Sequence, residues 1–571
     1  MDSGAISGFI WSVADLLRGD YKQSDYGKVI LPFTLLRRLD CVLDATKADV
    51  LAEYQARQHL KMPLDAFLLR KSGQIFYNIS ELDFARLLAD PANLRANLMG
   101  YVAGFSENAR DIFERYDFQV QIDRLDNAGL LYLIVQKFAA VDLHPRAVDN
   151  HKMGQVFEEL IRRFAELSNE TAGEHYTPRD VIALMVILLF ILDIDILSIA
   201  GIVRSMYDPT SGTGGMLSLS DEYVMQLNPQ ARLVLYGQEL NPESYAICKA
   251  DMLIKGQDVK NIILDNTLSD DGHPTLRANY MLANPPYGVE WKKVEAQVRK
   301  EHKERGFAGR FGPGLPRVSD GSLLFVLHLC SKMERPEAGG SRIGIVLNGS
   351  PLFTGGAGSG ESEIRKWIIE NDYLETIVAL PTDMFYNTGI ATYVWILTNV
   401  KKPERRGKMQ LINAVDFYQK MRKSLGSKRK ELGAQDIDRV KALYTACADG
   451  EHSKRFDNAE FGYRTITVER PQRDEHGEIV RNRKGEPVAD AALRDTENVP
   501  LSEDVQAYFA REVRPHAPDA WIDDTKTKIG YEIPFNRYFY QYTPPRALAA
   551  IDDDLQALGR EIMALLAEVV T

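Results

Sequence analysis

The sequence predicts an α/β protein with a mostly parallel sheet, preceded by an N-terminal helical domain and followed by a mostly helical C-terminal extension. Three observations support this prediction. Apolar residues recur at helical spacing early in the chain, short Val- and Ile-rich runs alternate with helical segments in the middle, and the remainder is largely polar. We expect a helical domain at residues 1–145, a sheet domain at residues 146–418 and a C-terminal region at residues 419–571.

The first 145 residues contain two apolar stripes. One runs through residues 6–17 and the other through residues 33–43, with apolar side chains three or four positions apart. Such a stripe is the buried face of an amphipathic helix. The spacing therefore indicates a helical domain with its own core and indicates no chemistry.

The middle of the chain contains six short apolar runs separated by helical segments. Several are rich in Val and Ile without strict alternation, as expected for strands that are covered on both faces of a parallel sheet. The expected strands are residues 233–236, 261–264, 280–283, 342–347, 376–380 and 392–397.

The composition is that of a globular protein, with 45% hydrophobic and 26% charged residues. The four cysteines form no Cys-x-x-Cys pair, so we expect no metal site, no disulfide framework and a reducing cytoplasmic location. No signal peptide is expected. Residues 184–203 are strongly apolar, but Asp193 and Asp195 would be costly inside a membrane, so a buried helix and a second short element are expected instead.

A glycine-rich turn follows a short apolar run at residues 202–203. Asp208 ends the strand expected to begin with that run, and Ser211, Gly212, Thr213 and Gly214 form the turn. A glycine-rich turn between a strand and a helix lets a ligand approach the backbone. We predict that these residues bind S-adenosylmethionine and that Asp208 orients its cationic amine. Taken alone, the glycines also fit a simple tight turn.

Two later strand ends carry further polar side chains. Glu239 ends the second expected strand, where nucleotide-binding sheets place a carboxylate on the ribose hydroxyls. Asp265 and Asn266 end the third strand, and either is a candidate for hydrogen bonding to the adenine of the cofactor. The spacing does not choose between the two, and both also fit a turn cap.

The tetrapeptide Asn284-Pro285-Pro286-Tyr287 ends the fourth expected strand. An aromatic amine is a poor nucleophile because its lone pair is delocalised. The side-chain oxygen of Asn284 and the carbonyl of Pro285 can accept its two N–H groups and aim the lone pair at a methyl carbon, while the prolines fix the backbone. Tyr287 offers a face for a flat base. The sequence thus predicts methyl transfer to a planar amino group.

A helix start precedes all of these motifs. Thr177 is the expected N-cap, Pro178 the first helical residue and Asp180 a capping acid. The preceding loop is expected to cover the cofactor, with Tyr176 and Thr177 near its methionine end.

In this order the motifs resemble those of adenine-N6 DNA methyltransferases, and more closely the modification (methylation) subunit of type I restriction-modification systems. Similarity extends over most of the chain, with one small departure at His175, where the family more often has an aromatic residue. The further stretches that carry the resemblance are residues 21–26, 319–321, 385–390, 518–523 and 534–537.

The resemblance implies a Rossmann-like, S-adenosylmethionine-dependent methyltransferase sheet. It also implies that adenine N6 in double-stranded DNA is the target, with the base flipped into the pocket. The implied partners are a specificity subunit that reads the sequence and a restriction subunit, with two copies of this chain in the complex. The net charge of −11 is unusual for a chain that binds DNA alone, and it is consistent with a partner that reads the bases. Residues 291–317, with eight basic and three acidic side chains, are the expected DNA-backbone contact.

Two alternatives remain open. The tetrapeptide is shared with protein-glutamine methyltransferases, and a scaffold that binds S-adenosylmethionine without turnover would keep the cofactor motifs. The long helical N-terminal domain argues against the first alternative, and intact Asn284 and Tyr287 argue against the second.

The C-terminal region carries a heptad pattern and a basic cluster. The cluster is expected to be a solvated helix face, and residues 468–498 an excursion or hairpin. The heptad pattern fits either pairing with a helix of another chain or docking on its own domain. The basic residues are Lys420, Arg422, Lys423, Lys428, Arg429 and Lys430, and the heptad residues are Leu548, Ile551, Leu555, Leu558, Ile562, Leu565 and Val569.

Overall fold

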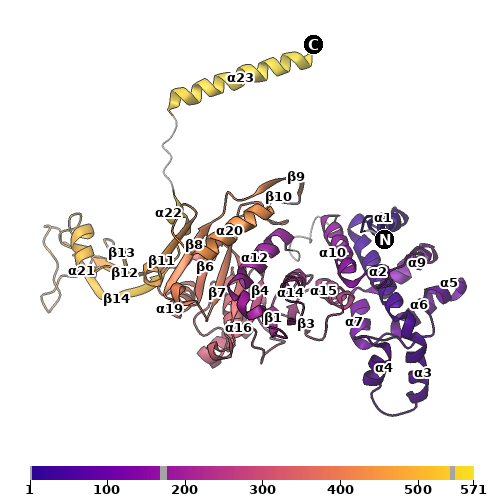
Figure 1. Ribbon diagram of the computed structural model, residues 1–571. Coiled ribbons are helices and arrows are strands. Elements are labelled where there is room, and N and C mark those ends of the chain that lie inside the picture. The colour runs from indigo at the N-terminus through magenta and orange to yellow at the C-terminus, as the bar shows by residue number, and fades with distance from the viewer. Residues whose placement is uncertain (1–2, 168–176, 541–546, 571) are drawn as a thin grey trace. The chain divides into compact units, whose positions relative to one another are not determined.

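The structure is a computed structural model that describes residues 3–167, 177–540 and 547–570 (Figure 1). The chain divides into two compact units, Met1–Ile533 and Pro534–Thr571, which are described separately.

The N-terminal region is helical, as the apolar stripes predict. Helix α2 buries most of its surface, and its Phe33 ring stacks on Phe138 at 5.4 Å between ring centroids and meets Phe118 edge-on at 4.9 Å. The helices are α1 (Ser3–Leu17), α2 (Tyr26–Leu43), α3 (Lys47–Arg57), α4 (Asp65–Ser72), α5 (Phe84–Ala89), α6 (Leu94–Ala103), α7 (Glu107–Arg115), α8 (Phe118–Asn127), α9 (Leu131–Ala139) and α10 (Asn150–Leu167).

A buried ion pair joins these helices to the sheet domain. Lys249, on α15 (Pro242–Lys255), donates to the Asp111 carboxylate on α7 at 2.7 Å, and the Tyr245 hydroxyl donates to the same oxygen at 2.9 Å. Helix α15 starts where the Asn241 side chain accepts two backbone N–H groups next to Pro242 at the first helical position. The same helix thus packs on the sheet and fixes the N-terminal region.

A nine-stranded sheet forms the centre of the larger unit, in the order β11-β8-β6-β7-β5-β4-β1-β2-β3. Strands β1 to β7 agree with the expected ones, whereas β8 and β11 were not expected. Strands β7 and β11 run antiparallel to their neighbours. The strands are β1 (Val203–Asp208), β2 (Arg232–Glu239), β3 (Ile262–Leu264), β4 (Tyr280–Ala283), β5 (Arg342–Asn348), β6 (Leu374–Ala379), β7 (Thr392–Thr398), β8 (Lys408–Asn413) and β11 (Ser453–Asp457).

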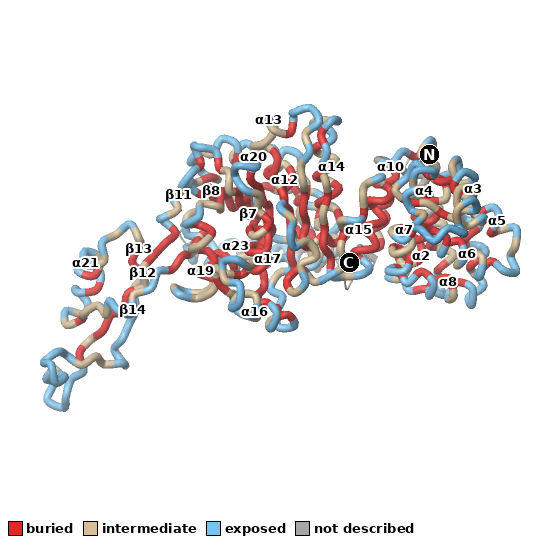
Figure 2. Tube along the Cα trace, turned by 90° about the horizontal axis from the view of Figure 1, so that it is seen from below, coloured by how far each residue is buried: buried red, intermediate tan, exposed pale blue. Residues whose placement is uncertain are grey.

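Helices cover both faces of this sheet, and the strands between them are buried (Figure 2). Helix α12 packs against α14 and α20 on one face, and α17 packs against α19 on the other. The helices are α12 (Arg179–Phe190), α13 (Ile194–Leu197), α14 (Gly215–Leu227), α16 (Glu295–Arg305), α17 (Ser322–Ser331), α18 (Ser350–Phe353), α19 (Gly360–Glu370) and α20 (Ala434–Ala446).

The strand order reverses between β1 and β4. Chain connections lead from β1 through β2 to β3 on one side, and from β4 to β5 on the other. The two central strands are parallel, with Met206 opposite Tyr280 and Tyr207 opposite Met281. Ligands bind to open α/β sheets at such a switch point, beyond the carboxyl ends of the strands.

The sheet continues past residue 418, where we expected a helical region to begin. Strand β11 pairs with β8, and α20 is held to the sheet by a buried network. In this network Arg342 pairs with Glu375 at 2.6 Å, and the Tyr444 hydroxyl donates to the same carboxylate at 2.5 Å. Breaking such a network would leave a buried charge without a partner, so α20 is an integral part of the sheet domain.

Strands rather than helices dominate the next segment, against the expected helical extension. β13 (Asp495–Pro500), β12 (Gly462–Glu469) and β14 (Trp521–Tyr531) form an antiparallel three-stranded sheet, with two short helical turns at residues 505–513 between β13 and β14. Strands β13 and β14 are largely polar and exposed, so their composition resembles that of a solvated segment. The excursion expected at residues 468–498 is confirmed by antiparallel bridges between Arg473 and Ile479 and between Arg481 and Pro487.

The smaller unit contains α22 (Phe535–Phe539) and α23 (Leu548–Val570). Helix α23 confirms the expected long C-terminal helix, and its described apolar side chains are exposed, Leu548 by 80% and Leu555 by 61%. The side chain of Val569 lies outside the described ones. No helix in the described ranges is both long enough and apolar enough to span a membrane.

Candidate active site

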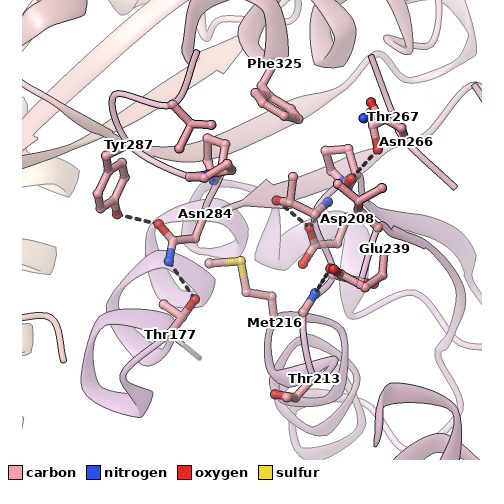
Figure 3. A pocket seen from close by; sticks show the side chains of 18 of the residues that line it. Thr177, Asp208, Thr213, Met216, Glu239, Asn266, Thr267, Asn284, Tyr287 and Phe325 are labelled. Atoms are coloured by element: carbon pink, nitrogen blue, oxygen red, sulfur yellow. Dashed lines mark hydrogen bonds between the residues drawn. The ribbon is translucent and has the colours of Figure 1, made fainter. Parts of the chain in front are cut away.

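A cavity of about 600 Å³ lies at the carboxyl ends of the central strands (Figure 3). Asn284 and Thr177 lie at one end of the view, and Asp208, Glu239 and Asn266 at the other. The sequence-predicted residues that line it are Thr177, Asp208, Ser211, Gly212, Thr213, Glu239, Asn266, Asn284, Pro285, Pro286 and Tyr287.

Three predicted residues stand apart from this lining. Tyr176 lies outside the described residues. Gly214 does not line the cavity but has φ +84° at the start of α14, and a Cβ there would meet the Cys248 sulfur at 2.8 Å. Asp265 is exposed, and its carboxylate accepts the backbone N–H of Asn266 at 2.8 Å. Of the two residues that the spacing left open, the structure therefore brings Asn266 to the cavity.

The turn after β1 presents a buried carboxylate. Asp208 is only 1% exposed, and its Oδ1 accepts the backbone N–H of Thr210 at 3.0 Å. Burial raises the pKa of Asp208 to about 7, the Thr210 amide opposes this rise, and the nearby Glu239 carboxylate adds to it. No cation among the described residues forms an ion pair with Asp208, and such a buried acid is suited to receive a cationic partner from a ligand.

Glu239 ties two parts of the site together. One carboxylate oxygen accepts the N–H of Gly212 at 2.8 Å, and the other accepts the N–H of Asn241 at 2.8 Å. Gly212 has a φ of +52°, a conformation that glycine adopts without strain. The end of β2 therefore fixes the glycine turn that follows β1, and each oxygen keeps a lone pair for a ligand hydroxyl.

The Asn284 side-chain amide is held from both sides. Its Nδ2 donates to Thr177 Oγ1 at 2.9 Å, and its Oδ1 accepts the Tyr287 hydroxyl. Burial raises the pKa of Tyr287 well above its usual value, so that its hydroxyl stays protonated and available as a donor. The Phe385 ring meets Tyr287 edge-on at 5.8 Å between centroids. The amide plane is thus set before any substrate enters.

The helix start near Thr177 differs from the expected capping box. Pro178 is the N-cap residue, and no side chain caps the helix. Asp180 instead pairs with Lys428 at 2.9 Å and accepts the backbone N–H of Leu432 at 2.9 Å. Thr177 contacts Asn284 instead of capping the helix. The Asp180 carboxylate, expected to cap the helix, binds Lys428 and Leu432, which lie 248 and 252 positions further along the chain.

Several lining residues were not singled out as site residues from the sequence. Phe385 and Asn387 come from the loop between β6 and β7 and belong to a stretch that carried the family resemblance. That resemblance was the only signal in the sequence that could have pointed to these two residues, because no local pattern assigns a loop so distant in sequence to the cavity. Other lining residues of this kind include Met216, Thr267, Trp291, Lys293 and Phe325.

The basic segment at residues 291–317 is largely helical rather than an open loop. Arg310 in this segment is half-buried and bonded within the protein: it pairs with Glu301 at 2.7 Å and donates to the backbone carbonyls of Thr267 at 2.6 Å and Leu268 at 2.9 Å. This one side chain is therefore not available to the DNA backbone, whereas the contact expected for the segment as a whole stays a prediction. Arg310 instead holds the chain that follows Asn266.

Comparison with known proteins identifies the family. A family model described as N-6 DNA methylase matches residues 148–463, and one described as HsdM N-terminal domain matches residues 6–138. The chain belongs to the N-6 DNA methylase family. This DNA methyltransferase uses S-adenosylmethionine as its methyl donor.

Relatives of this N-6 DNA methylase include the type I restriction enzyme MjaIX methylase subunit of Methanocaldococcus jannaschii, which is 25% identical over 472 residues, or 79% of each chain. A type I restriction-modification methyltransferase subunit from Streptococcus thermophilus has the same fold, with a TM-score of 0.64 at 22% identity over 81% of this chain and 97% of that one. A chain from a study of type I system assembly aligns with a TM-score of 0.53 at 18% identity, over 99% of this chain and 97% of that one.

The cavity fits this cofactor. The buried Asp208 carboxylate matches a cationic amine, the lone pairs of Glu239 match ribose hydroxyls, and the turn at Gly212 admits a close backbone approach.

We predict that the affinity for S-adenosylmethionine falls as the pH drops below about 7, because protonation of Asp208 removes the charge that attracts the amine. Well below that pH the dissociation constant should rise about tenfold per unit. Titration calorimetry between pH 5.5 and 7.5 measures this. Asp208→Asn should bind weakly with a flat profile, and an equally steep profile in that variant would refute the role.

We also predict that Thr177→Val lowers kcat about three- to tenfold, since one hydrogen bond worth about 1 kcal/mol no longer orients Asn284. Thr177→Ser keeps the acceptor and should retain the wild-type rate. Single-turnover transfer and cofactor titration separate the effects. A loss of cofactor affinity with an unchanged rate would instead indicate direct contact with the cofactor.

Proposed function

We propose that this enzyme methylates the N6 nitrogen of adenine in double-stranded DNA, as the catalytic subunit of a type I restriction-modification complex. The observation that carries the proposal is the Asn284 amide, held by Thr177 and Tyr287 at the cavity that Asp208 and Glu239 also line. The match to the N-6 DNA methylase model supports adenine as the base.

Each side of the cavity has its own role in this proposal. Asp208 holds the amine of the cofactor, Glu239 its ribose and Asn266 its adenine, while residues 211–213 lie along it. Tyr176 and Thr177 are proposed to lie near its methionine end. When bound, S-adenosylmethionine supplies an electrophilic methyl carbon.

The tetrapeptide acts on the target amine. The Asn284 oxygen and the Pro285 carbonyl accept its two N–H groups, which turns the nitrogen lone pair out of conjugation and toward the methyl carbon. Because Thr177 fixes the amide, this geometry requires little reorganisation. Tyr287 and the neighbouring Phe385 offer aromatic surface for a base flipped out of the duplex.

The proposal is tested by incubating the chain and its specificity subunit with tritiated S-adenosylmethionine and duplex DNA. Label should appear as N6-methyladenine in the digested DNA. Label on protein glutamine, with none in the DNA, would contradict the proposal and favour a protein methyltransferase.

Asn284→Ala should abolish this transfer while the dissociation constant for S-adenosylmethionine changes no more than a few-fold, because the contacts of Asn284 are to the target amine. Filter binding alongside the label assay measures both quantities. Residual transfer near the wild-type rate would exclude the proposed acceptor, and loss of cofactor binding would mean that the pocket is misassigned.

Helix α23 is proposed to bind the specificity subunit. Its apolar stripe at heptad spacing is exposed, including Ile551 by 37% and Leu558 by 56%. Such a stripe is stabilised by pairing with another helix. A restriction subunit, two copies of this chain and a cytoplasmic location complete the proposed assembly.

We predict that deleting residues 548–571 weakens the complex with the specificity subunit and leaves cofactor binding intact, because the cavity lies in the other unit. Size-exclusion chromatography of the co-expressed pair measures this. An unchanged complex would argue against the role of α23.

A further inference from the structure

A β-hairpin next to the pocket carries a cluster of exposed cationic charge. Strands β9 (Gln419–Leu425) and β10 (Lys428–Glu431) form it where a solvated helix face was expected. Residues 419–431 contain six cations and one acid, in a chain whose net charge is −11. Four of the cations are exposed and form no ion pair within the described part of the chain, namely Lys420, Arg422, Lys423 and Arg429.

A buried ion pair anchors the hairpin next to the active site. Lys428 is 3% exposed, and its ammonium donates to both carboxylate oxygens of Asp180, at 2.9 and 3.1 Å, and to the Met384 carbonyl at 3.0 Å. Asp180 lies three positions after Thr177. A lysine at this depth needs such partners, so it anchors the turn end of the hairpin, while four other cations of the hairpin stay exposed.

The hairpin turn also contacts the loop that lines the cavity. The backbone N–H of Ser427 donates to the Tyr386 carbonyl at 2.8 Å, and that of Arg429 donates to Asp383 at 2.9 Å. Tyr386 lies between Phe385 and Asn387, which both line the cavity. The turn comes so close to this loop that a Cβ on Gly426 would lie 2.4 Å from the Tyr386 carbonyl oxygen.

Topology places these contacts at the pocket edge of the sheet. The loop at residues 380–391 joins the end of β6 to the start of antiparallel β7, so it emerges at the carboxyl ends of the parallel strands. The hairpin projects beyond the sheet beside α12 and α20 (Figure 1). The hairpin therefore lies beside the edge of the sheet at which Asn284 directly follows β4.

We propose that the β9–β10 hairpin binds the phosphate backbone of the DNA beside the nucleotide that enters the pocket. This inference rests on the proposed function. Phosphates attract clustered Lys and Arg side chains and position a duplex without reading its bases. A rigidly anchored basic hairpin also offsets the repulsion between DNA and an acidic chain, at the place where the target base must be held.

The test neutralises three exposed cations in the full-length variant Lys420→Gln/Arg422→Gln/Lys423→Gln. A matched control, Lys402→Gln/Arg406→Gln/Lys408→Gln, removes equal charge from exposed positions between β7 and β8, at the opposite edge of the sheet. The affinity for a fluorescent duplex of arbitrary sequence is measured by anisotropy at several salt concentrations. Cofactor affinity, which should stay unchanged in both variants, reports correct folding.

The hairpin variant should bind the duplex more weakly and with a salt dependence whose slope is smaller by about 0.9 for each phosphate that the hairpin no longer neutralises. The control should match the wild type. Equal slopes for all three proteins, equally weakened binding in both variants, or no binding by the wild type would each overturn the proposal. Failure of the proposed function would appear separately, as absence of N6-methyladenine in the labelling assay with wild-type protein.

Discussion

The parallel pairing of β1 with β4 is the constraint on which the rest of the site depends. This pairing sets Tyr207 opposite Met281, so the chain leaves both strands at the same edge of the sheet. Asp208 directly follows Tyr207, and Asn284 comes three residues after Met281, although the two motifs are far apart in the sequence. The carboxylate suited to a cationic amine and the amide suited to a target nitrogen therefore line one cavity, as the switch point of an open α/β sheet allows.

Hydrogen bonds to buried or half-buried groups then fix the orientation of the functional side chains. Glu239 holds the glycine turn through the N–H of Gly212, and Thr177 and Tyr287 hold the Asn284 amide. These contacts join the ends of β1, β2 and β4 to the start of α12. A site arranged in advance in this way lowers the cost of reorganisation during methyl transfer.

The sequence predicted most of the central strands, and most of the site residues that it predicted line the cavity. Each of these motifs directly follows a short apolar strand, and its role depends on local neighbours. It did not place Phe385 and Asn387 at the cavity, since a loop is assigned to a site only when the strands are ordered in space. It counted Arg310 among the eight basic residues of the expected DNA contact at 291–317, because net charge does not show which cation is bonded to backbone carbonyls within the protein. The β-rich segment after residue 418 was missed because half-exposed strands have the polar composition of solvated helices.

Hydrogen exchange measured by mass spectrometry, with and without S-adenosylmethionine, tests most directly that the cofactor binds at this switch point. The account predicts slower exchange on cofactor addition in peptides that cover residues 208–216, 239–241 and 264–268, because these segments line the cavity or hold its walls. Exchange in the hairpin at residues 419–431 should not change. Protection confined to other parts of the chain, with none at residues 208–216, would contradict the account.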